Sequence, residues 1–589
     1  MNDTLKCSVM VAATVAASGL CLADGPTLAK RLEAPFALKT KVALVPGKRY
    51  RLSCRVKQED LRLKDGRPSA MSIGFWMYDA EGKLCRTPTC HGGFSFHGRA
   101  GETNWYELTD TSVTIPTNAA YAWFEQYSDK KATGHVWLSD AKAEPFNPPP
   151  VDYVISSAGH DTAWEGNVTF TMALDAGVSA KGRRATMLYP DASGGETRAE
   201  MAFASDGRSA SVRVPVASMA MGIQSFRFVL SGADGLSEAW SGCLRFERKE
   251  ASPLPAVWCG PDRKFVVRGK KFWPLATKLW GGDFKLGPDV KRMLAASGYN
   301  AFVISSGHLN DRVQGWFEEN GKMAIVAVPH EDEEAAAAVR RLKGSPVTLM
   351  WYLYDEPHAF GAIEQMRAHT RLVHRLDPDH PTRACFDKIY YARMFLDCQD
   401  VICADPYPIG SGAEIGQVLD WSRQLSAGIF ASKPLIMTPQ SFDWSWYRGA
   451  NDERAQGNHV RRMPTEDEMR CMAWQAIAGG ANGLAWFSMH ALLTFPKAAE
   501  KERYIGETLK VAREIADMIP VMLDEDVALP GARDLPPCIG VRAWRHDGQV
   551  RAVAVNSSRE RVSCTLDLGG GKSLALDLAP IETRFLTVR

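Results

Sequence analysis

Short stretches of alternating apolar and polar residues dominate the first part of the chain. Residues 50–56 and 122–127 are examples, and turns such as Val45-Pro46-Gly47-Lys48 separate them. Alternation with a period of two predicts strands that bury one face. The sequence therefore predicts a β-sandwich over residues 24–148.

A second series of alternating stretches follows a stiff proline-rich linker at Asn147-Pro148-Pro149-Pro150. Its strands are predicted at 168–172, 209–214 and 225–230. Their spacing over about 100 residues predicts an immunoglobulin-like sandwich at 151–250.

The pattern changes after residue 255, where short apolar stretches alternate with segments of helical period. Asp332–Leu342 and Ile363–Leu376 are two of the predicted helices. Repeated strand–helix units predict a (β/α)₈ barrel, also called a TIM barrel, over residues 258–522. An open doubly wound sheet is the alternative, but the Gly-rich phosphate loop typical of that fold is missing from the first strand–helix turn. The eight predicted strands are 272–280, 299–305, 322–329, 347–355, 382–387, 400–405, 433–439 and 482–488.

Two further segments extend this multidomain architecture. The stretch 265–272 predicts a hairpin that closes the lower end of the barrel. Two apolar stretches flank His546-Asp547-Gly548, which is a hairpin signal. A small β-sandwich is therefore predicted at 527–589.

The N-terminal residues differ from the rest in composition. Lys6 precedes an apolar run at 9–22 that ends beside Ala23. This pattern predicts a signal peptide at 1–23 and export to the periplasm or the extracellular space. Lipidation of Cys21 is less favoured because Gly19-Leu20 fits a lipobox poorly, and an uncleaved anchor is the other alternative. No later segment has the length of a membrane span.

Charge and cysteine content exclude several classes of partner. The chain has 70 Lys and Arg against 68 Asp and Glu, without a basic tract of five residues, so no nucleic-acid partner is predicted. Cysteines such as Cys385 and Cys403 lie in apolar stretches and are predicted to be small buried side chains. No zinc-site spacing occurs, and neither a metal nor a cofactor is predicted. The sequence does not determine the oligomeric state.

The stretch Met350–Pro357 carries the main candidate for chemistry. An aromatic-rich strand ends there in two adjacent carboxylates, Asp355 and Glu356, before Pro357 stops the strand. Carboxylates at the end of a buried strand cost desolvation free energy, which is tolerated most often at sites of chemistry.

The other predicted strands also end in carboxylates and aromatic side chains. In a barrel these ends form the ligand site. Carboxylates supply acid, base or nucleophile and flat rings stack on sugars, so the set predicts glycoside hydrolysis on an oligosaccharide or polysaccharide. The predicted substrate-binding residues are Trp280, His308, Asp405, Tyr407, Gln440, Asp443, Trp444 and Trp486.

The hairpin 265–272, the stretch Tyr352–Pro357 and Asp405-Pro406-Tyr407-Pro408 together resemble the barrels of glycoside hydrolase clan A. That resemblance implies that Glu356 is the acid/base of a retaining enzyme. In the clan an Asn usually precedes this Glu, whereas here it is Asp355. The clan's nucleophile is a Glu on strand seven, where this chain has Gln440.

The adjacent pair Asp355-Glu356 is also similar to the pair in glycoside hydrolase families 20 and 123. That resemblance implies an N-acetylhexosaminidase in which the sugar's own 2-acetamido oxygen attacks the anomeric carbon. Glu356 would then be the acid and Asp355 the partner of the acetamido group.

Several alternatives stay open at this point. Asp355 could pair with Lys278 or Arg383, which would leave Asp405 or Asp443 as the second carboxylate. The barrel could also be catalytically silent and bind glycans. The first sandwich resembles jelly-roll carbohydrate-binding modules through Pro46-Gly47-Lys48-x-Tyr50-x-Leu52 and residues 134–141, and a sandwich without a ligand is equally compatible with these residues.

Overall fold

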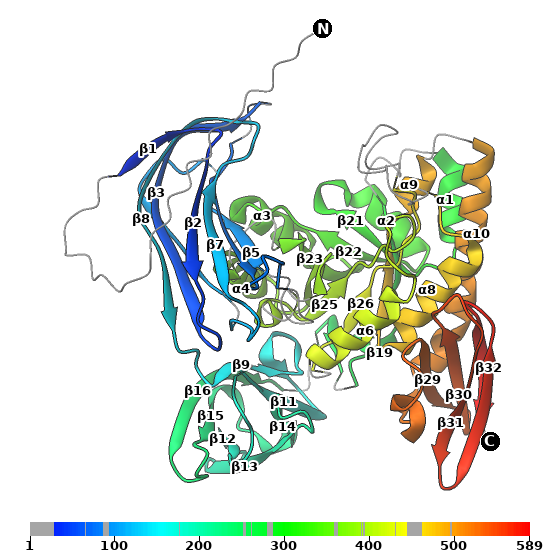
Figure 1. Ribbon diagram of the computed structural model, residues 1–589. Helices are drawn as coiled ribbons and strands as arrows, with labels where there is room; N and C mark the ends of the chain where they lie inside the picture. The colour runs from blue at the N-terminus through cyan, green and yellow to red at the C-terminus, as the bar shows by residue number, and fades with distance from the viewer. Residues whose placement is uncertain are drawn as a thin grey trace.

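A closed eight-stranded parallel barrel forms the centre of the molecule (Figure 1). This computed structural model describes residues 29–64, 66, 68–85, 93–99, 101–112, 114–175, 177–250, 255–260, 262–279, 287–357, 363–389, 392, 395–429, 432–444, 462–494 and 498–588. The strands are β20 (Leu275–Lys278), β21 (Ala301–Ser305), β22 (Met323–Ala327), β23 (Thr348–Asp355), β24 (Thr382–Phe386), β25 (Val401–Ala404), β26 (Leu435–Met437) and β27 (Gly483–Trp486). All eight predicted barrel strands are confirmed.

Helices surround the barrel and connect its strands. The predicted helices at 332–342 and 363–376 are confirmed with the same bounds. Local capping explains where some helices begin: the Asn310 side chain accepts a hydrogen bond from the Val313 amide at the start of the second helix. The helices are α1 (Gly287–Ala295), α2 (Asp311–Glu319), α3 (Asp332–Leu342), α4 (Ile363–Leu376), α6 (Gln417–Gly428), α8 (Glu466–Ala478), α9 (Met489–Leu493) and α10 (Ala498–Met522).

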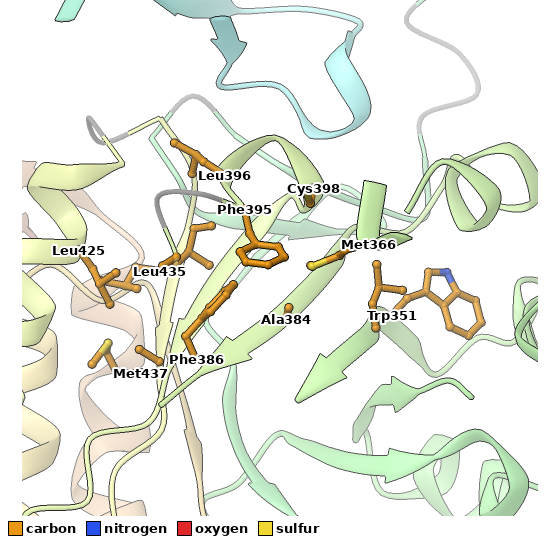
Figure 2. Packing of buried hydrophobic residues seen from close by; sticks show 14 of the residues in the cluster. Trp351, Met366, Ala384, Phe386, Phe395, Leu396, Cys398, Leu425, Leu435 and Met437 are labelled. Carbon is orange, nitrogen blue, oxygen red and sulfur yellow. The ribbon is translucent and has the colours of Figure 1, made fainter. Parts of the chain in front are cut away.

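The strands bury both faces, as their nearly continuous apolar sequences require. Outward side chains such as Trp351, Phe386 and Met437 pack against Met366 of α4 and Leu425 of α6 (Figure 2). A separate apolar core fills the inside of the barrel. The inward positions above that core are therefore the ones that can form a site.

A three-stranded sheet closes the amino-terminal end of the barrel. It consists of β17 (Val257–Cys259), β18 (Phe265–Val267) and β19 (Lys270–Phe272). The Val257 amide donates to the Asp379 carbonyl just before β24, and Phe265 belongs to the inner core. The predicted hairpin at 265–272 is thus confirmed, and the opposite end of the barrel is the one left open for a ligand.

Two four-stranded sheets lie near the N-terminus and enclose an apolar core, as the alternating sequence predicts. Inward residues such as Phe75 and Phe124 are buried, whereas their neighbours Trp76 and Trp123 are not. One sheet contains β1 (Lys30–Glu33), β8 (Ala132–Phe146), β3 (Arg49–Leu63) and β6 (Tyr106–Thr111), and the other contains β2 (Ala37–Ala43), β7 (Tyr121–Tyr127), β4 (Ser72–Tyr78) and β5 (Gly93–His97).

The next strands form one continuous eight-stranded sheet instead of the two separate sheets of an immunoglobulin domain. Phe170 lies 5.3 Å from Phe226 and 5.2 Å from Phe246, measured between ring centroids, although their strands are distant in the sheet order. The sheet therefore folds over its own core. Its strands are β9 (Val151–Ser156), β10 (Thr162–Ala163), β11 (Asn167–Leu174), β12 (Ala185–Pro190), β13 (Glu196–Phe203), β14 (Ser209–Pro215), β15 (Gly222–Ser231) and β16 (Glu238–Arg248).

The C-terminal strands pack against the barrel's helices through Arg542, which donates to the Ala481 carbonyl at 2.6 Å. The hairpin at His546-Asp547-Gly548 is confirmed, and Asp547 and Gly548 both have the positive φ that its turn requires. The strands are β28 (Glu525–Val527), β29 (Ile539–His546), β30 (Gln549–Asn556), β31 (Val562–Gly569), β32 (Lys572–Leu578) and β33 (Thr583–Val588).

Two predictions about the chain ends and membranes have different outcomes. The predicted signal peptide at 1–23 lies outside the described residues. Within the described residues, no helix combines the length and the apolar character needed to cross a bilayer.

Candidate active site

A cavity of about 560 Å³ opens at the carboxyl ends of the barrel strands. Its walls combine four carboxyl side chains with three basic or phenolic side chains from β20, β23 and β24, and with several aromatic rings. The carboxylates are Asp355, Glu356, Asp387 and Asp405, the three groups are Lys278, Tyr352 and Arg383, and the rings are Tyr407, Phe442, Trp444 and Phe487.

Asp355 and Glu356 both face this cavity, although adjacent residues of a regular strand point to opposite faces. Two local departures from regular geometry explain this. The register of β23 against β24 shifts between Tyr352 and Tyr354. Glu356 then takes a left-handed conformation with φ of 51°, while its amide still donates to the Cys385 carbonyl at 2.9 Å. A non-glycine residue in that region is strained, and such strain is concentrated at functional sites.

Asp355 is held by two neighbours inside the barrel. The Tyr352 hydroxyl donates to its Oδ1 at 2.5 Å, and Lys278 Nζ lies 3.4 Å from its Oδ2. The side chain of Asp355 is still 49% exposed. The predicted pairing with Lys278 is therefore present, yet it leaves the carboxylate available to a ligand in the cavity.

Glu356 has few compensating charges around it. Burial, followed by the nearby carboxylates of Asp387 and Asp355, raises the pKa of Glu356 to about 7. Lys388 and Lys278 oppose this shift only in part. A carboxyl group that titrates near neutral pH can donate a proton and later take one back, which is what an acid/base catalyst requires.

Asp405 is the most deeply buried carboxyl group of the cavity, at 8% exposure. Burial and the charge of Asp355 raise its pKa well above the usual range for an aspartic acid. Its Oδ1 has no hydrogen-bond partner among the described residues. This environment favours the protonated form of Asp405, in which the carboxyl group donates a hydrogen bond.

Aromatic rings form one continuous wall of the cavity. Tyr407 meets Phe442 edge to face at 4.9 Å between centroids, and Phe442 meets Trp444 in the same way at 5.2 Å. Phe487 lies 5.7 Å from Phe442 and carries Lys278 Nζ over its ring at 4.9 Å. Such a surface suits the apolar C–H face of a sugar or a methyl group.

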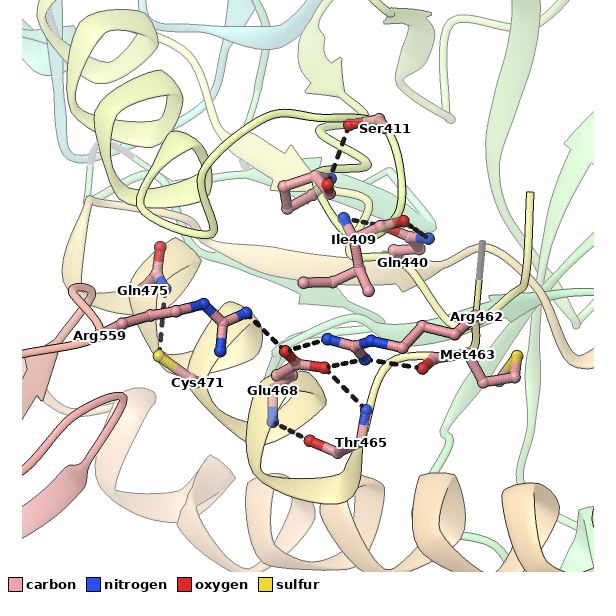
Figure 3. A network of polar contacts seen from close by, with 11 residues as sticks. Ile409, Ser411, Gln440, Arg462, Met463, Thr465, Glu468, Cys471, Gln475 and Arg559 are labelled. Atoms are coloured by element: carbon pink, nitrogen blue, oxygen red, sulfur yellow. Dashed lines mark hydrogen bonds and ion pairs between the residues drawn. The ribbon is translucent and has the colours of Figure 1, made fainter. Parts of the chain in front are cut away.

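Other predicted substrate-binding residues lie elsewhere. Gln440 is fully buried outside the cavity, where its amide binds the backbone of Ile409 (Figure 3). It also donates to the Phe442 carbonyl. Trp486 is buried in the core between barrel and helices. These two placements do not support contact with a substrate, because neither side chain reaches the cavity. His308 is exposed and Asp443 is half-buried, and both lie outside the cavity lining, while Trp280 falls outside the described residues.

Reasoning from the sequence missed Lys278, Tyr352, Arg383, Phe442 and Phe487 as cavity residues. The available signal was alternation along each strand, since Phe487 follows the outward Trp486. Cys385 and Cys403 are buried as predicted, and Cys385 also reaches the cavity. Among the described residues, no group of three or more His, Cys, Asp or Glu side chains is arranged to hold a metal ion.

No known family description matches the chain, and no curated protein matches it. Solved structures align with it weakly over most of its length. A candidate β-galactosidase from Bacteroides fragilis shares 11% identity over 92% of this chain and 89% of that chain, with a TM-score of 0.33. A candidate glycoside hydrolase from Bacteroides vulgatus shares 11% over 70% and 88%, with a TM-score of 0.38. The β-D-glucuronidase of Dictyoglomus thermophilum shares 12% over 77% and 82%, with a TM-score of 0.30. These scores are all below 0.5, so nothing about this chain's activity follows from them.

Proposed function

We propose that the protein is a glycoside hydrolase that cleaves O-glycosidic bonds with Glu356 as the general acid/base. The observation that carries this proposal is the environment of Glu356 at the mouth of the barrel cavity. Its backbone is strained, and the pKa of its carboxyl group is raised to about 7. The aromatic wall supports a sugar as the ligand.

In the proposed first step, Glu356 gives its proton to the glycosidic oxygen as the bond from that oxygen to the anomeric carbon breaks. The electrons for the new bond at the anomeric carbon must come from a nucleophile. Asp405 fits this role poorly, because burial and the charge of Asp355 raise its pKa well above the usual range and so disfavour the carboxylate form, and β26 leads to Gln440, which lies outside the cavity. A nucleophile that belongs to the substrate fits the site better.

We therefore propose a substrate with a 2-acetamido group, whose carbonyl oxygen attacks the anomeric carbon to form an oxazolinium ion. Asp355, fixed by Tyr352 and Lys278, accepts a hydrogen bond from the acetamido N–H. The aromatic wall takes the methyl group. Water then attacks the anomeric carbon while Glu356 removes its proton, and the product retains the anomeric configuration.

The test is a panel of aryl glycosides that pairs each 2-acetamido sugar with its 2-hydroxy counterpart. Substrate assistance predicts hydrolysis of the acetamido member only, together with competitive inhibition by a thiazoline analogue of the oxazolinium ion. Comparable turnover of the 2-hydroxy member, without thiazoline inhibition, would instead require an enzyme nucleophile.

The alternative of a catalytically silent, glycan-binding barrel rested on Gln440 at the end of strand seven. Gln440 is buried and is not among the residues that line the cavity, which supports an active barrel over that alternative. We also propose export of the protein, supported by the apolar run at 9–22 in the sequence.

A further inference from the structure

Arg383 lies at the floor of the cavity and is only 2% exposed. It is the second residue of β24, so its Cα lies two residues, or about 6.6 Å, below that of Cys385 along the strand. Its Nε and Nη1 atoms have no hydrogen-bond partner among the described residues. Two donors of a buried guanidinium are thus left without a hydrogen-bond partner in the wall of the cavity, where both nitrogens are closed off from solvent.

The charge of Arg383 is also not balanced by a nearby acidic side chain of the usual kind. No carboxylate in the described part of the chain forms an ion pair with it. Its guanidinium instead lies over the Tyr352 ring, 4.4 Å from the centroid. A cation–π contact is much weaker than a carboxylate pair in a buried place, and proteins seldom bury a charge without a partner. A group on the ligand can supply the missing partner.

The floor of the cavity has room for such a group. Apart from the Tyr352 ring, the inward side chains around Arg383 are of small or medium size. They come from different strands and are Val303, Cys385, Thr438 and Ala485. The space they leave connects Arg383 with the level of Asp355 and Glu356.

We propose that this floor is a subsite for an oxyanion substituent of the sugar, either a carboxylate or a sulfate ester, which binds the Arg383 guanidinium where it lines the cavity. This inference rests on the proposed glycoside hydrolase function and narrows its substrate class. The planar guanidinium fork suits both kinds of oxyanion. Lys278, which projects from β20 on the opposite side of the barrel, adds a second positive charge to the cavity lining.

The test compares aryl glycosides that differ in one substituent. The sugar keeps its 2-acetamido group throughout and carries a 6-hydroxyl, a 6-sulfate or, in the corresponding uronate, a 6-carboxylate. The wild-type protein is expected to show a kcat/KM roughly 10- to 100-fold higher for an oxyanion-bearing member than for its neutral counterpart. Preference for the sulfate or for the carboxylate identifies the source of the oxyanion.

The variant Arg383→Met should abolish that preference, so that kcat/KM becomes equal for the charged and the neutral substrate. Arg340→Met, which removes an exposed arginine from the last turn of α3, is the matched control and should keep the wild-type ratio. Should Arg383→Met fail to fold, Arg383→Lys takes its place, because it keeps the charge but loses the fork. It should lower the preference about tenfold.

Three outcomes would overturn the inference: equal wild-type activity on charged and neutral members, an equal loss on both in Arg383→Met, or an unchanged ratio in Arg383→Lys. Equal activity on the neutral and the sulfated 2-acetamido substrate would reject the oxyanion subsite but would be consistent with the proposed function. If no glycoside is cleaved, the proposed function fails. Calorimetry with free hexose and hexuronate then tests the subsite. Equal affinity for the two sugars would reject the subsite, and tenfold tighter binding of hexuronate would support it.

Discussion

Two glutamates of this protein, the half-buried Glu356 and the buried Glu468, have opposite electrostatic surroundings. Glu468 lies in the first turn of α8, and its side chain is 2% exposed. It receives hydrogen bonds from Arg462 at 2.6 and 2.7 Å, from Arg559 at 2.7 Å and from the Thr465 amide at 3.0 Å (Figure 3). Although burial raises its pKa, the bonds from Arg462 and Arg559 lower it to about 2.

The surroundings of Glu356 have the opposite effect. Burial and then the nearby carboxylates of Asp387 and Asp355 raise its pKa to about 7. This difference distinguishes a carboxyl group that stabilises the fold from one that can take part in catalysis. A carboxylate whose lone pairs are all occupied stabilises the fold and has nothing left to exchange. A carboxyl group that is crowded by like charges costs folding free energy and holds a transferable proton. The following experiments test this separation.

The largest effect is expected for Glu356→Gln. The amide keeps the shape of the side chain but cannot donate a proton to a leaving group, so turnover of the best aryl glycoside should fall roughly 10²- to 10⁴-fold. Thermal unfolding should be unchanged or slightly improved, because the variant removes an unfavourably buried acid. Glu318→Gln, an exposed position on α2, serves as the control and should keep wild-type turnover. Turnover near the wild-type value in Glu356→Gln would remove Glu356 from the mechanism.

Glu468→Gln should show the reverse profile. The variant loses the charge that binds both arginines, so the free energy of unfolding should fall by roughly 2–4 kcal/mol. Turnover at a temperature where the variant is folded should stay close to wild type. Urea unfolding monitored by tryptophan fluorescence measures the loss, and Glu318→Gln is again the exposed comparison. A change below about 0.5 kcal/mol would show that the network around α8 contributes no more than a surface pair.

The pH dependence of stability should have opposite signs at the two sites. Folded Glu356 holds its proton more tightly than the unfolded chain, whose value is 4.5, so its burial destabilises the fold progressively as pH rises from 4.5 to about 7. The stability of Glu356→Gln relative to wild type should therefore improve over that range. Glu468 stabilises the fold above pH 4.5 and loses this effect as pH falls toward about 2.

The deficit of Glu468→Gln should accordingly be largest at neutral pH and shrink in acid. Urea unfolding of both variants and wild type between pH 3.5 and 8 measures these trends. Turnover by the wild type should decline above pH 7 as Glu356 loses its proton. Curves of the same slope for both variants would mean that the two carboxyl groups do not differ in the way described above.

The sequence predicts more about the barrel than about its site, for a physical reason. Apolar periodicity fixes which segments are strands and helices, and for α3 and α4 it gives the observed bounds. It also locates Asp355 and Glu356, because a buried strand that ends in acids before proline is unusual. A shift of one residue in strand register exchanges the side chains that face the cavity with those that face the helices.

Trp486 and Gln440 illustrate that dependence. Trp486 was predicted as a ligand residue, yet Ala485 and Phe487 point inward and Trp486 points out. Gln440 lies three residues beyond the end of β26, where the loop turns its amide toward the backbone of Ile409. Arg383 was considered only as a partner for Asp355, because the sequence does not show that its guanidinium lines a cavity.

The smallest effect is expected for Tyr352→Phe, which removes one hydrogen bond from the carboxylate beside Glu356. The hydroxyl donates to Asp355 Oδ1 at 2.5 Å. Loss of this hydroxyl leaves the ion pair with Lys278 to orient the carboxylate. If Asp355 must be oriented to hold an acetamido group, kcat/KM for the acetamido substrate should fall roughly 5- to 10-fold. Tyr354→Phe is a close control two residues away, since Tyr354 stacks on His330 outside the cavity.

Stability should change little in either tyrosine variant, because the ring and its packing stay in place. Steady-state kinetics on the acetamido glycoside and on its 2-hydroxy counterpart separates orientation from general damage, since only the first reaction depends on Asp355 in the proposed mechanism. An equal loss on both substrates would place Asp355 among the structural carboxylates with Glu468, and would leave Glu356 as the sole carboxyl group of the cavity that acts on the substrate.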